Sequence, residues 1–351
     1  MSVGGDKIVV HEISEEQGEQ TPVRRIPVGI SACLTGMPVR HDGGHKHSRY
    51  CTQDLSAYFD LHTFCPEHDS GLPVPRPAMH LVERGDALRM EVIKTSEDVT
   101  GSIDAWSREY LPHMSALSGF VLASKSPSCG FERVRVYSPK GDVLRRDAQG
   151  LFAHKLMQAF PQMPVEDAGR LFDPSLRENF LARVFIYDEW TQLCRDGITA
   201  KKLIEFHTRH KFQLLAQSEK TYRKLGPMLS QLNLRNGSAA TKEGNQPAFS
   251  TLEELAEAYF AIFMDGMRQP SKRGSHVNVM LHLLGFFRTV LSGAERNSIK
   301  THIEAYLRGE LPLIVPISLL RHTLQRYPND YLKNQAYLSP YPDALGLRNP
   351  L

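Results

Sequence analysis

Three short apolar segments of this chain each end in a loop that carries a cysteine. Helical patterns lie between them, at residues 52–59 and 100–114. Strands that alternate with helices predict a largely parallel sheet with helices on its faces. Ligands of such sheets bind beyond the carboxyl ends of the strands, so the three cysteines can converge there. The segments and their cysteines are 27–30 with Cys33, 61–64 with Cys65, and 120–123 with Cys129.

The rest of the first half fits the same architecture. Glycine-containing turns mark two hairpins, and one more helix and strand follow the last of the three cysteines. We therefore predict a Rossmann-like α/β domain with a mainly parallel sheet over residues 22–170. The additional predicted elements are a hairpin at 80–93, a hairpin that turns at 140–142, a helix at 150–160 and a strand at 163–166.

The second half is dominated by helical patterns. The run Asp173-Pro174-Ser175 is typical of a helix start and closes the first domain. A stretch rich in Asn, Gly, Ser and Lys, residues 233–246, is predicted to be a mobile loop. We predict an all-α domain over residues 171–351, with helical patterns at 201–225, 252–267, 276–291 and 295–307.

Composition restricts the class of protein. A net charge of +3 over 351 residues is too small to indicate a nucleic-acid or membrane partner by itself. Residues 1–21 are predicted to form a disordered acidic leader, because they carry five acidic side chains and lack the apolar core of an export signal. The longest apolar run, 311–320, is too short to span a bilayer, so we expect a cytoplasmic protein.

The odd number of cysteines argues against a disulfide framework. The chain has five cysteines and no Cys-x-x-Cys pair, which leaves metal binding, catalysis or simple burial. Residues 65–77 read CPEHDSGLPVPRP, and proline and glycine at this density predict a stiff loop in place of a helix or central strand. This loop is either one wall of a site or a structural proline turn with a buried thiol.

Three converging thiolates can hold zinc with a fourth ligand, or an iron–sulfur cluster. Cys51 and Cys194 do not follow predicted strands, and we interpret them as free thiols. A cubane cluster on three cysteines leaves one iron without a protein ligand, open to a sulfur-bearing substrate. Glu67 and Ser126 are then expected beside it, to move protons or activate water.

Three motifs carry a family resemblance. They are SACLTG at 31–36 with VRHDGG at 39–44, CPE at 65–67 with GLPVPRP at 71–77, and SPSCG at 126–130. In this order they resemble the thiouracil desulfidase family, over about residues 26–168. His41 and the run His68-Asp69-Ser70 depart from the family pattern and concern the pocket that receives the substrate.

The resemblance implies a 4Fe–4S cluster on Cys33, Cys65 and Cys129, and non-redox removal of sulfur from a thiolated nucleobase. It also implies that Glu67 and Ser126 are the catalytic proton-transfer pair. Candidate substrate-binding residues in the same motifs and the loop beside them are Ser31, Asp42, Lys46, Arg76 and Ser128.

The second half resembles a helical domain of unknown function that occurs alone in YbgA-type proteins and fused behind desulfidase-like domains. The matching residues are HTRHKFQL at 207–214, HVNVMLH at 276–282 and LPLIVP at 311–316. His207 and His210 share one helix face, but no carboxylate completes a metal site, so we interpret them as hydrogen-bonding histidines. Lysines and arginines with interleaved aromatic residues on the same helix also allow contact with nucleic acid.

The function predicted from the sequence is therefore iron–sulfur-dependent desulfidation of a small thiolated base such as 2-thiouracil. Two alternatives stay open. One is a non-catalytic metal or iron–sulfur module that senses or braces, with the helical half recruiting a partner. The other is desulfidation of thiolated nucleosides within RNA.

Overall fold

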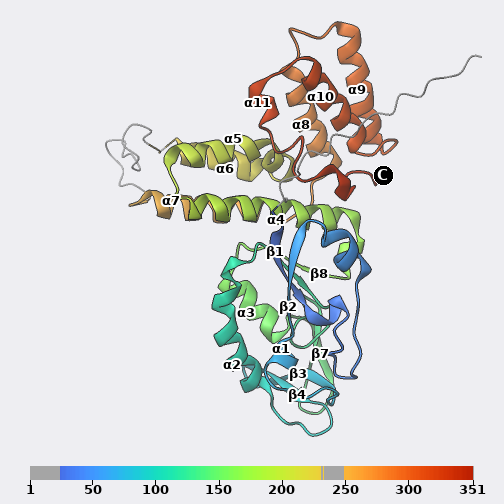
Figure 1. Ribbon diagram of the computed structural model, residues 1–351, viewed down its shortest axis with the longest axis vertical. Coiled ribbons are helices and arrows are strands. Elements are labelled where there is room, and N and C mark those ends of the chain that lie inside the picture. Colours follow the sequence, from blue (N-terminus) through green and yellow to red (C-terminus); the bar gives the residue numbers. More distant parts are fainter. Residues whose placement is uncertain (1–23, 231, 233–248, 351) are drawn as a thin grey trace, which may run out of the picture.

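The computed structural model describes residues 24–230, 232 and 249–350. The predicted leader at 1–21 and the predicted loop at 233–246 lie outside these residues. The N-terminal part contains a four-stranded sheet, here called sheet A, in which all neighbouring strands are parallel (Figure 1). Its strands, in spatial order, are β2 (Phe59–Phe64), β1 (Ile26–Ser31), β5 (Phe120–Leu122) and β8 (Val165–Asp167).

The strand order of sheet A determines where a crevice opens along its edge. The chain runs from β1 to β2 on one side, and then crosses to β5 on the other side of β1. The strand order thus reverses around β1, and such a switch point opens a crevice at the carboxyl ends of the strands. The predictions of a mainly parallel sheet and of strands before Cys33, Cys65 and Cys129 are confirmed.

A second four-stranded sheet, sheet B, carries both predicted hairpins. Its two antiparallel pairs are joined by a parallel contact between β3 and β6. It packs a small apolar core of its own, around Leu81, Met90 and Val136, against Ile103 of α2. Its strands, in spatial order, are β4 (Ala87–Val92), β3 (Met79–Arg84), β6 (Val134–Tyr137) and β7 (Val143–Ala148).

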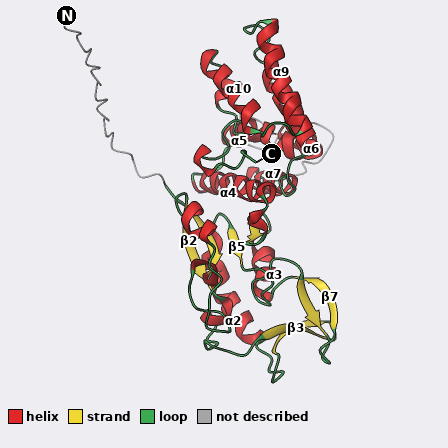
Figure 2. Ribbon diagram, turned by 90° about the vertical axis from the view of Figure 1, so that its right-hand side faces the viewer, coloured by secondary structure: helices red, strands yellow, loops and turns green. Residues whose placement is uncertain are grey.

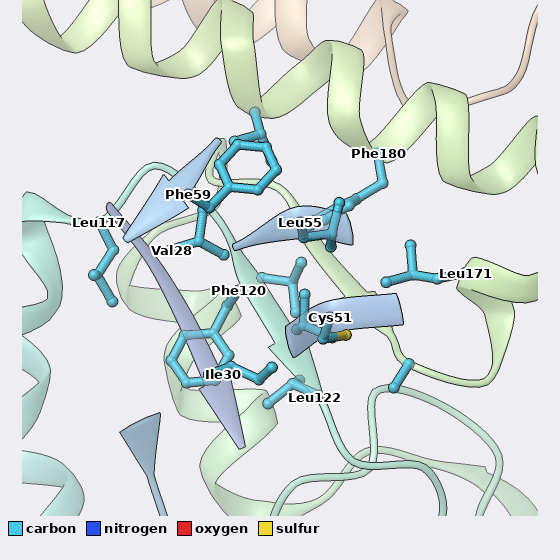
Figure 3. Close-up of a cluster of buried hydrophobic side chains, with 14 of the residues drawn as sticks. Val28, Ile30, Cys51, Leu55, Phe59, Leu117, Phe120, Leu122, Leu171 and Phe180 are labelled. Carbon is cyan, nitrogen blue, oxygen red and sulfur yellow. The ribbon is translucent and has the colours of Figure 1, made fainter. Parts of the chain in front are cut away.

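Short helices join the strands of sheet A and cover it. Phe59, Phe120 and Phe152 are fully buried in its core, and Cys51 lies among these apolar side chains at 1% exposure (Figure 3). Burial of this kind stabilises by about 1.5–3 kcal/mol for each large apolar side chain. The helices of this part are η1 (Ala32–Thr35), the π-helix η2 (Tyr50–Leu55), α1 (Pro66–Asp69), α2 (Thr100–Tyr110), η3 (Leu111–Ala116), α3 (Leu151–Ala159) and η4 (Arg170–Phe172).

The long helix α4 (Pro174–Arg195) connects the two halves (Figures 1 and 2). Asp173 caps its first turn by accepting hydrogen bonds from the amides of Ser175 and Leu176, as the Asp-Pro-Ser run predicted. Phe180 and Val184 pack into the core of sheet A. Trp190, further along α4, packs into an apolar core of the helical part.

After β8 the named elements are all helices, as predicted. They form two apolar cores, which share α5. In the described part of the chain, no helix is both long enough and apolar enough to cross a membrane. The helices after α4 are α5 (Ala200–Gln217), α6 (Glu219–Leu229), α7 (Leu252–Gly266), α8 (Arg273–Gly285), α9 (Gly293–Arg308), α10 (Ile314–Arg326), α11 (Asp330–Lys333) and η5 (Asp343–Leu345).

Two local predictions need correction. The stiff loop at 65–77 begins with one helical turn, α1, because Pro66 occupies the first helical position, where its missing N–H costs nothing. The helical pattern at 201–225 is two helices, since Ser218 adopts an extended backbone and its side chain caps α6.

Candidate functional site

Cys33, Cys65 and Cys129 line one cavity of about 450 Å³ at the carboxyl ends of β1, β2 and β5. Cys33 lies in η1, which follows β1 directly, and Cys65 lies between β2 and α1. Cys129 lies in the loop that follows β5. The switch point of sheet A therefore brings together three thiols that are separated by up to 96 positions in the chain.

The turn that carries Cys129 is held from two sides. The Ser126 hydroxyl accepts hydrogen bonds from the amides of Ser128 (3.2 Å) and Cys129 (3.1 Å). The carbonyl of Ser128 accepts from two amides in the first turn of α3, and Gly150 lies directly against it. A Cβ atom at Gly150 would stand 2.4 Å from that carbonyl oxygen, so only glycine permits this approach.

The turn that carries Cys65 is equally fixed. The amide of Cys65 donates to the Asp69 carboxylate (2.8 Å), and the amide of Leu72 donates to the carbonyl of Glu67 (3.2 Å). The Asp69 side chain thus ties the last residue of α1 to the backbone of Cys65 and fixes the short helix that carries Glu67. The carbonyl of Cys33 accepts from the amide of Lys46 (2.8 Å), which draws the glycine-rich loop over the cavity.

A hydrogen-bonded chain of buried side chains connects Arg76 to Cys129. Arg76 donates through Nε (3.0 Å) and Nη2 to Oε2 of Glu67, and its Nη2 also donates to the carbonyl of Val39. The other oxygen of Glu67, Oε1, accepts from the hydroxyl of Ser128 (2.6 Å) and at longer range from that of Ser126 (3.4 Å). Ser126 and Ser128 are also within 2.9 Å of each other.

The Glu67 carboxylate is thereby fixed in orientation. Its Oε2 is used by the guanidinium, so Oε1 is the oxygen left to exchange a proton with the serine hydroxyls. The Ser128 hydroxyl lies 3.7 Å from the sulfur of Cys129, which brings this proton-carrying chain up to the thiols.

Burial keeps the thiols protonated. It raises the pKa of Cys65 to about 11 and raises the pKa of Cys33 and of Cys129 as well, because a thiolate loses hydration inside the protein. For Cys33, the cations of Lys46 and Arg40 oppose this effect. A positively charged metal group would reverse the balance, since a coordinating thiol is deprotonated outright.

Cationic side chains dominate the charged part of the lining. Arg40, Lys46, Arg76 and Lys125 line the cavity, against the one carboxylate of Glu67. Lys125 stands in a left-handed backbone conformation (φ 61°), which is uncommon for a residue with a Cβ and is found preferentially at functional sites.

Four of the five predicted substrate-binding residues line this cavity, and one does not. Ser31, Lys46 and Ser128 line it, and the hydroxyl of Ser31 accepts from the amide of Ala123 (3.0 Å). Arg76 also lines it, but its guanidinium is engaged with Glu67 and with the carbonyls of Val39 and Pro73. Asp42 lies outside the lining, where its side chain, 50% exposed, accepts from the amide of Gly44.

Sequence reasoning did not identify Arg40 and Lys125 as lining residues. Arg40 lies within the motif at 39–44 and Lys125 directly precedes the motif at 126–130, so position in the sequence was the available signal. His41 lines the cavity, whereas His68, Asp69 and Ser70 are not part of its lining. Cys194 is exposed, and Cys51 belongs to the core of sheet A.

In the helical part, the paired histidines take up hydrogen bonds with neighbouring side chains. His207 contacts the hydroxyl of Tyr259 (3.0 Å), and His210 lies 3.1 Å from Glu189. Phe206 and Phe212 are buried in the helical cores, at 2% and 7% exposure. These two rings are therefore not available to stack on nucleic-acid bases, whereas the third aromatic residue of that hypothesis, Tyr222 on α6, is only partly buried.

Comparison with known proteins divides the chain in the same way. Residues 28–168 match the model of the family described as 2-thiouracil desulfurase, and residues 211–342 match a family of unknown function, DUF1722. The chain is 28% identical over 172 residues to the uncharacterized protein YbgA of Escherichia coli strain K12. The aligned residues make up 49% of this chain and 94% of YbgA. A solved structure of TudS, a 4Fe-4S-dependent thiouracil desulfidase, is 28% identical with a TM-score of 0.34, over 42% of this chain and 95% of TudS.

Proposed function

Because residues 28–168 of this chain match the family model described as 2-thiouracil desulfurase, we propose that its N-terminal part removes sulfur from a thiolated nucleobase such as 2-thiouracil. The reaction converts a thiocarbonyl and water to a carbonyl and hydrosulfide, with release of a proton. The observation that carries the proposal is the gathering of three thiols, a carboxylate and two serine hydroxyls around one cavity.

The residues fit a 4Fe–4S cluster on Cys33, Cys65 and Cys129. Thiol sulfurs are the donors that such clusters use, and here they are spread around a cavity of about 450 Å³. No group of three Cys, His, Asp or Glu side chains within the described residues could hold a single metal ion. The cationic lining complements the negative charge that three thiolates bring, and this supports the same assignment.

When bound, a cluster with three protein ligands supplies a Lewis-acidic iron with affinity for sulfur. The chain's own residues manage the water and the protons. Glu67 Oε1 takes a proton from the attacking water, either directly or through the hydroxyl of Ser126, and can return it to the departing sulfur. Arg76 acts as a positioning residue that holds Oε2 and so keeps Oε1 directed at the serines.

The lining residues bind and orient the base. Lys46 and Lys125 can donate to the exocyclic carbonyl oxygen of the base and stabilise negative charge that develops on it, while Ser31 and Ser128 add hydroxyl groups to the lining. The apolar side chains of Phe64, Ala78 and Met79 complete the lining and exclude water from the ring faces.

Release of hydrosulfide from 2-thiouracil by anaerobically purified protein tests this function. Wild type is expected to turn over, and Glu67→Gln should keep its iron and sulfide content but lose about 100-fold or more in kcat, because the amide cannot accept the proton. Glu109→Gln makes the same change at an exposed position of α2 and should be active.

One result would contradict the proposed function, and another would contradict only the role of Glu67. A protein that carries stoichiometric zinc and releases no hydrosulfide would support a bracing or sensing module instead. Activity that survives in Glu67→Gln would remove the proton-transfer role from that carboxylate while leaving the reaction itself in place.

A further inference from the structure

A second cavity, of about 240 Å³, lies where the start of α4 meets the helical part. It is distinct from the thiol-lined cavity and shares no lining residue with it. Its walls come from α4, α5, α8, α9 and the segment after η5, so it forms only when the helical part is assembled. Its volume admits several water molecules or one small organic molecule.

The lining side chains that are more than nine-tenths buried include those of Gln213, His276, Tyr306 and Arg348. Each of these four has a polar atom that makes no hydrogen bond to the described residues: Nε2 of Gln213, Nε2 of His276, Oη of Tyr306 and Nη2 of Arg348. None of these atoms is completely enclosed by protein, so each keeps surface in the cavity. These side chains are buried but the four atoms stay accessible, so water or a ligand that enters the cavity can hydrogen-bond to them.

The remaining bonds of these side chains fix their positions. His276 Nδ1 pairs with the hydroxyl of Tyr337 (2.9 Å). Arg348 donates through Nε to Glu178 (3.0 Å) and through Nη1 to the carbonyl of Tyr337 (2.8 Å). The site is therefore built before any ligand arrives, with its donor atoms held in place.

The balance of hydrogen-bonding groups favours a ligand with anionic oxygens. Arg273 also lines the cavity, stacked on Tyr306 with 5.0 Å from Cζ to the ring centroid, and has no carboxylate within 4.0 Å among the described residues. Each of the two carboxylates in the lining is engaged through one oxygen, Oε1 of Glu178 and Oδ1 of Asp173. Glu178 accepts from Arg348 and Tyr341, and Asp173 caps α4.

We propose that this cavity binds a small molecule bearing a carboxylate or phosphate group, held by Arg273, Arg348, Gln213 and Tyr306. Arginine forks and amide donors suit both groups, because each offers two or more oxygens in one plane or face. The proposal does not depend on the desulfidase reaction and gives the helical part a ligand-binding role of its own.

Binding of two probes to the full chain tests the proposal. Inorganic phosphate and succinate are titrated separately by calorimetry and by thermal unfolding, with sodium chloride at matched ionic strength as the reference. Saturable one-to-one binding of either probe supports the site, and the probe that binds more tightly identifies the group. Equal effects of phosphate, succinate and chloride would overturn the proposal and leave a cavity filled by water.

Variants assign the binding to this cavity. Arg273→Met is expected to weaken binding of the favoured probe tenfold or more, whereas Arg288→Met, at an exposed position beyond α8, should leave it unchanged. Tyr306→Phe removes one oxygen only and should weaken binding severalfold without affecting folding. Unchanged affinity in both Arg273→Met and Tyr306→Phe would place the bound anion elsewhere and refute the site.

Discussion

The two cavities of this protein differ in how their polar groups are satisfied. In the thiol-lined cavity Arg76, Glu67 and Ser128 hydrogen-bond to one another, so the carboxylate is oriented in the absence of any ligand. In the helical cavity, Gln213 and Tyr306 are just as deeply buried but leave polar atoms without partners among the described residues. The first arrangement suits chemistry, where a group must be preorganised, and the second suits recognition, where the ligand completes the bonds.

The largest expected effect on stability follows from removing the arginine that hydrogen-bonds to Glu67. Arg76→Met leaves the Glu67 carboxylate buried without its cation, and we expect a loss of about 3–5 kcal/mol in the free energy of unfolding. Urea unfolding followed by Trp106 fluorescence, in a Trp190→Phe background, measures this loss in the α/β part.

Arg145→Met is the matched control, since its ion pair with Glu83 is exposed and should contribute about 1 kcal/mol or less. Equal losses in the two variants would mean that the Arg76–Glu67 pair is not the buried anchor described above.

A smaller effect is expected where the turn of Cys129 packs on α3. Gly150→Ala brings a methyl group against the carbonyl of Ser128, and the forced backbone shift should cost about 1–3 kcal/mol. Iron loading should fall with it, because Cys129 moves with the turn. Gly101→Ala adds the same methyl group to open space in α2, and a similar penalty there would show that the contact at Gly150 is unimportant.

The helical cavity should respond to acid through His276. Burial, aided by the charge of Arg348, lowers the pKa of this imidazole to about 3, against about 6.5 in an unfolded chain. The unfolded state therefore binds the proton first, so stability is lost as the pH falls from about 6.5 towards 3, by at most about 1.4 kcal/mol per pH unit.

Urea unfolding at pH 7, 6 and 5, followed by Trp190 in a Trp106→Phe background, reports on the helical part. His276→Asn should reduce the pH dependence and leave the part contributed by His207, since burial lowers the pKa of that imidazole as well, to about 4, whereas His282→Asn, at an exposed position of α8, should preserve it. A slope that is the same in all three proteins would contradict the burial of a neutral imidazole at 276.

The smallest effect on stability is expected at the hydroxyl of Tyr306, which has no hydrogen-bond partner among the described residues. Tyr306→Phe should change the free energy of unfolding by less than about 0.5 kcal/mol without added anion, because no described residue bonds to Oη. With a saturating anion, wild type should gain more stability than the variant. A loss above 1 kcal/mol in the anion-free protein would show that the hydroxyl already has a partner.

The thiol-lined site could be predicted from the sequence because its residues are local and chemically distinctive. Each cysteine follows a recognisable strand, and parallel topology brings the strand ends together. Which groups pair inside the site was not predictable. Arg76 was expected to meet the substrate but holds Glu67, and Asp42 was expected in the pocket but caps its own turn.

The helical cavity gave no sequence signal for a related reason. Its polar residues are spread over several elements between positions 173 and 348, each within an ordinary amphipathic helix or loop. His276 belongs to a motif, but a single histidine on a helix is more often part of a core than of a site. Only the packing of five segments makes the group visible.

We propose that Cys33, Cys65 and Cys129 hold an iron–sulfur cluster, and the direct test is the iron and acid-labile sulfide content of anaerobically purified protein. Wild type should contain about four of each per chain, and alanine at any of the three cysteines should remove most of both. Cys51→Ala and Cys194→Ala, outside the cavity, should retain them. Full iron and sulfide in Cys65→Ala, or an equal loss in Cys194→Ala, would contradict the assignment.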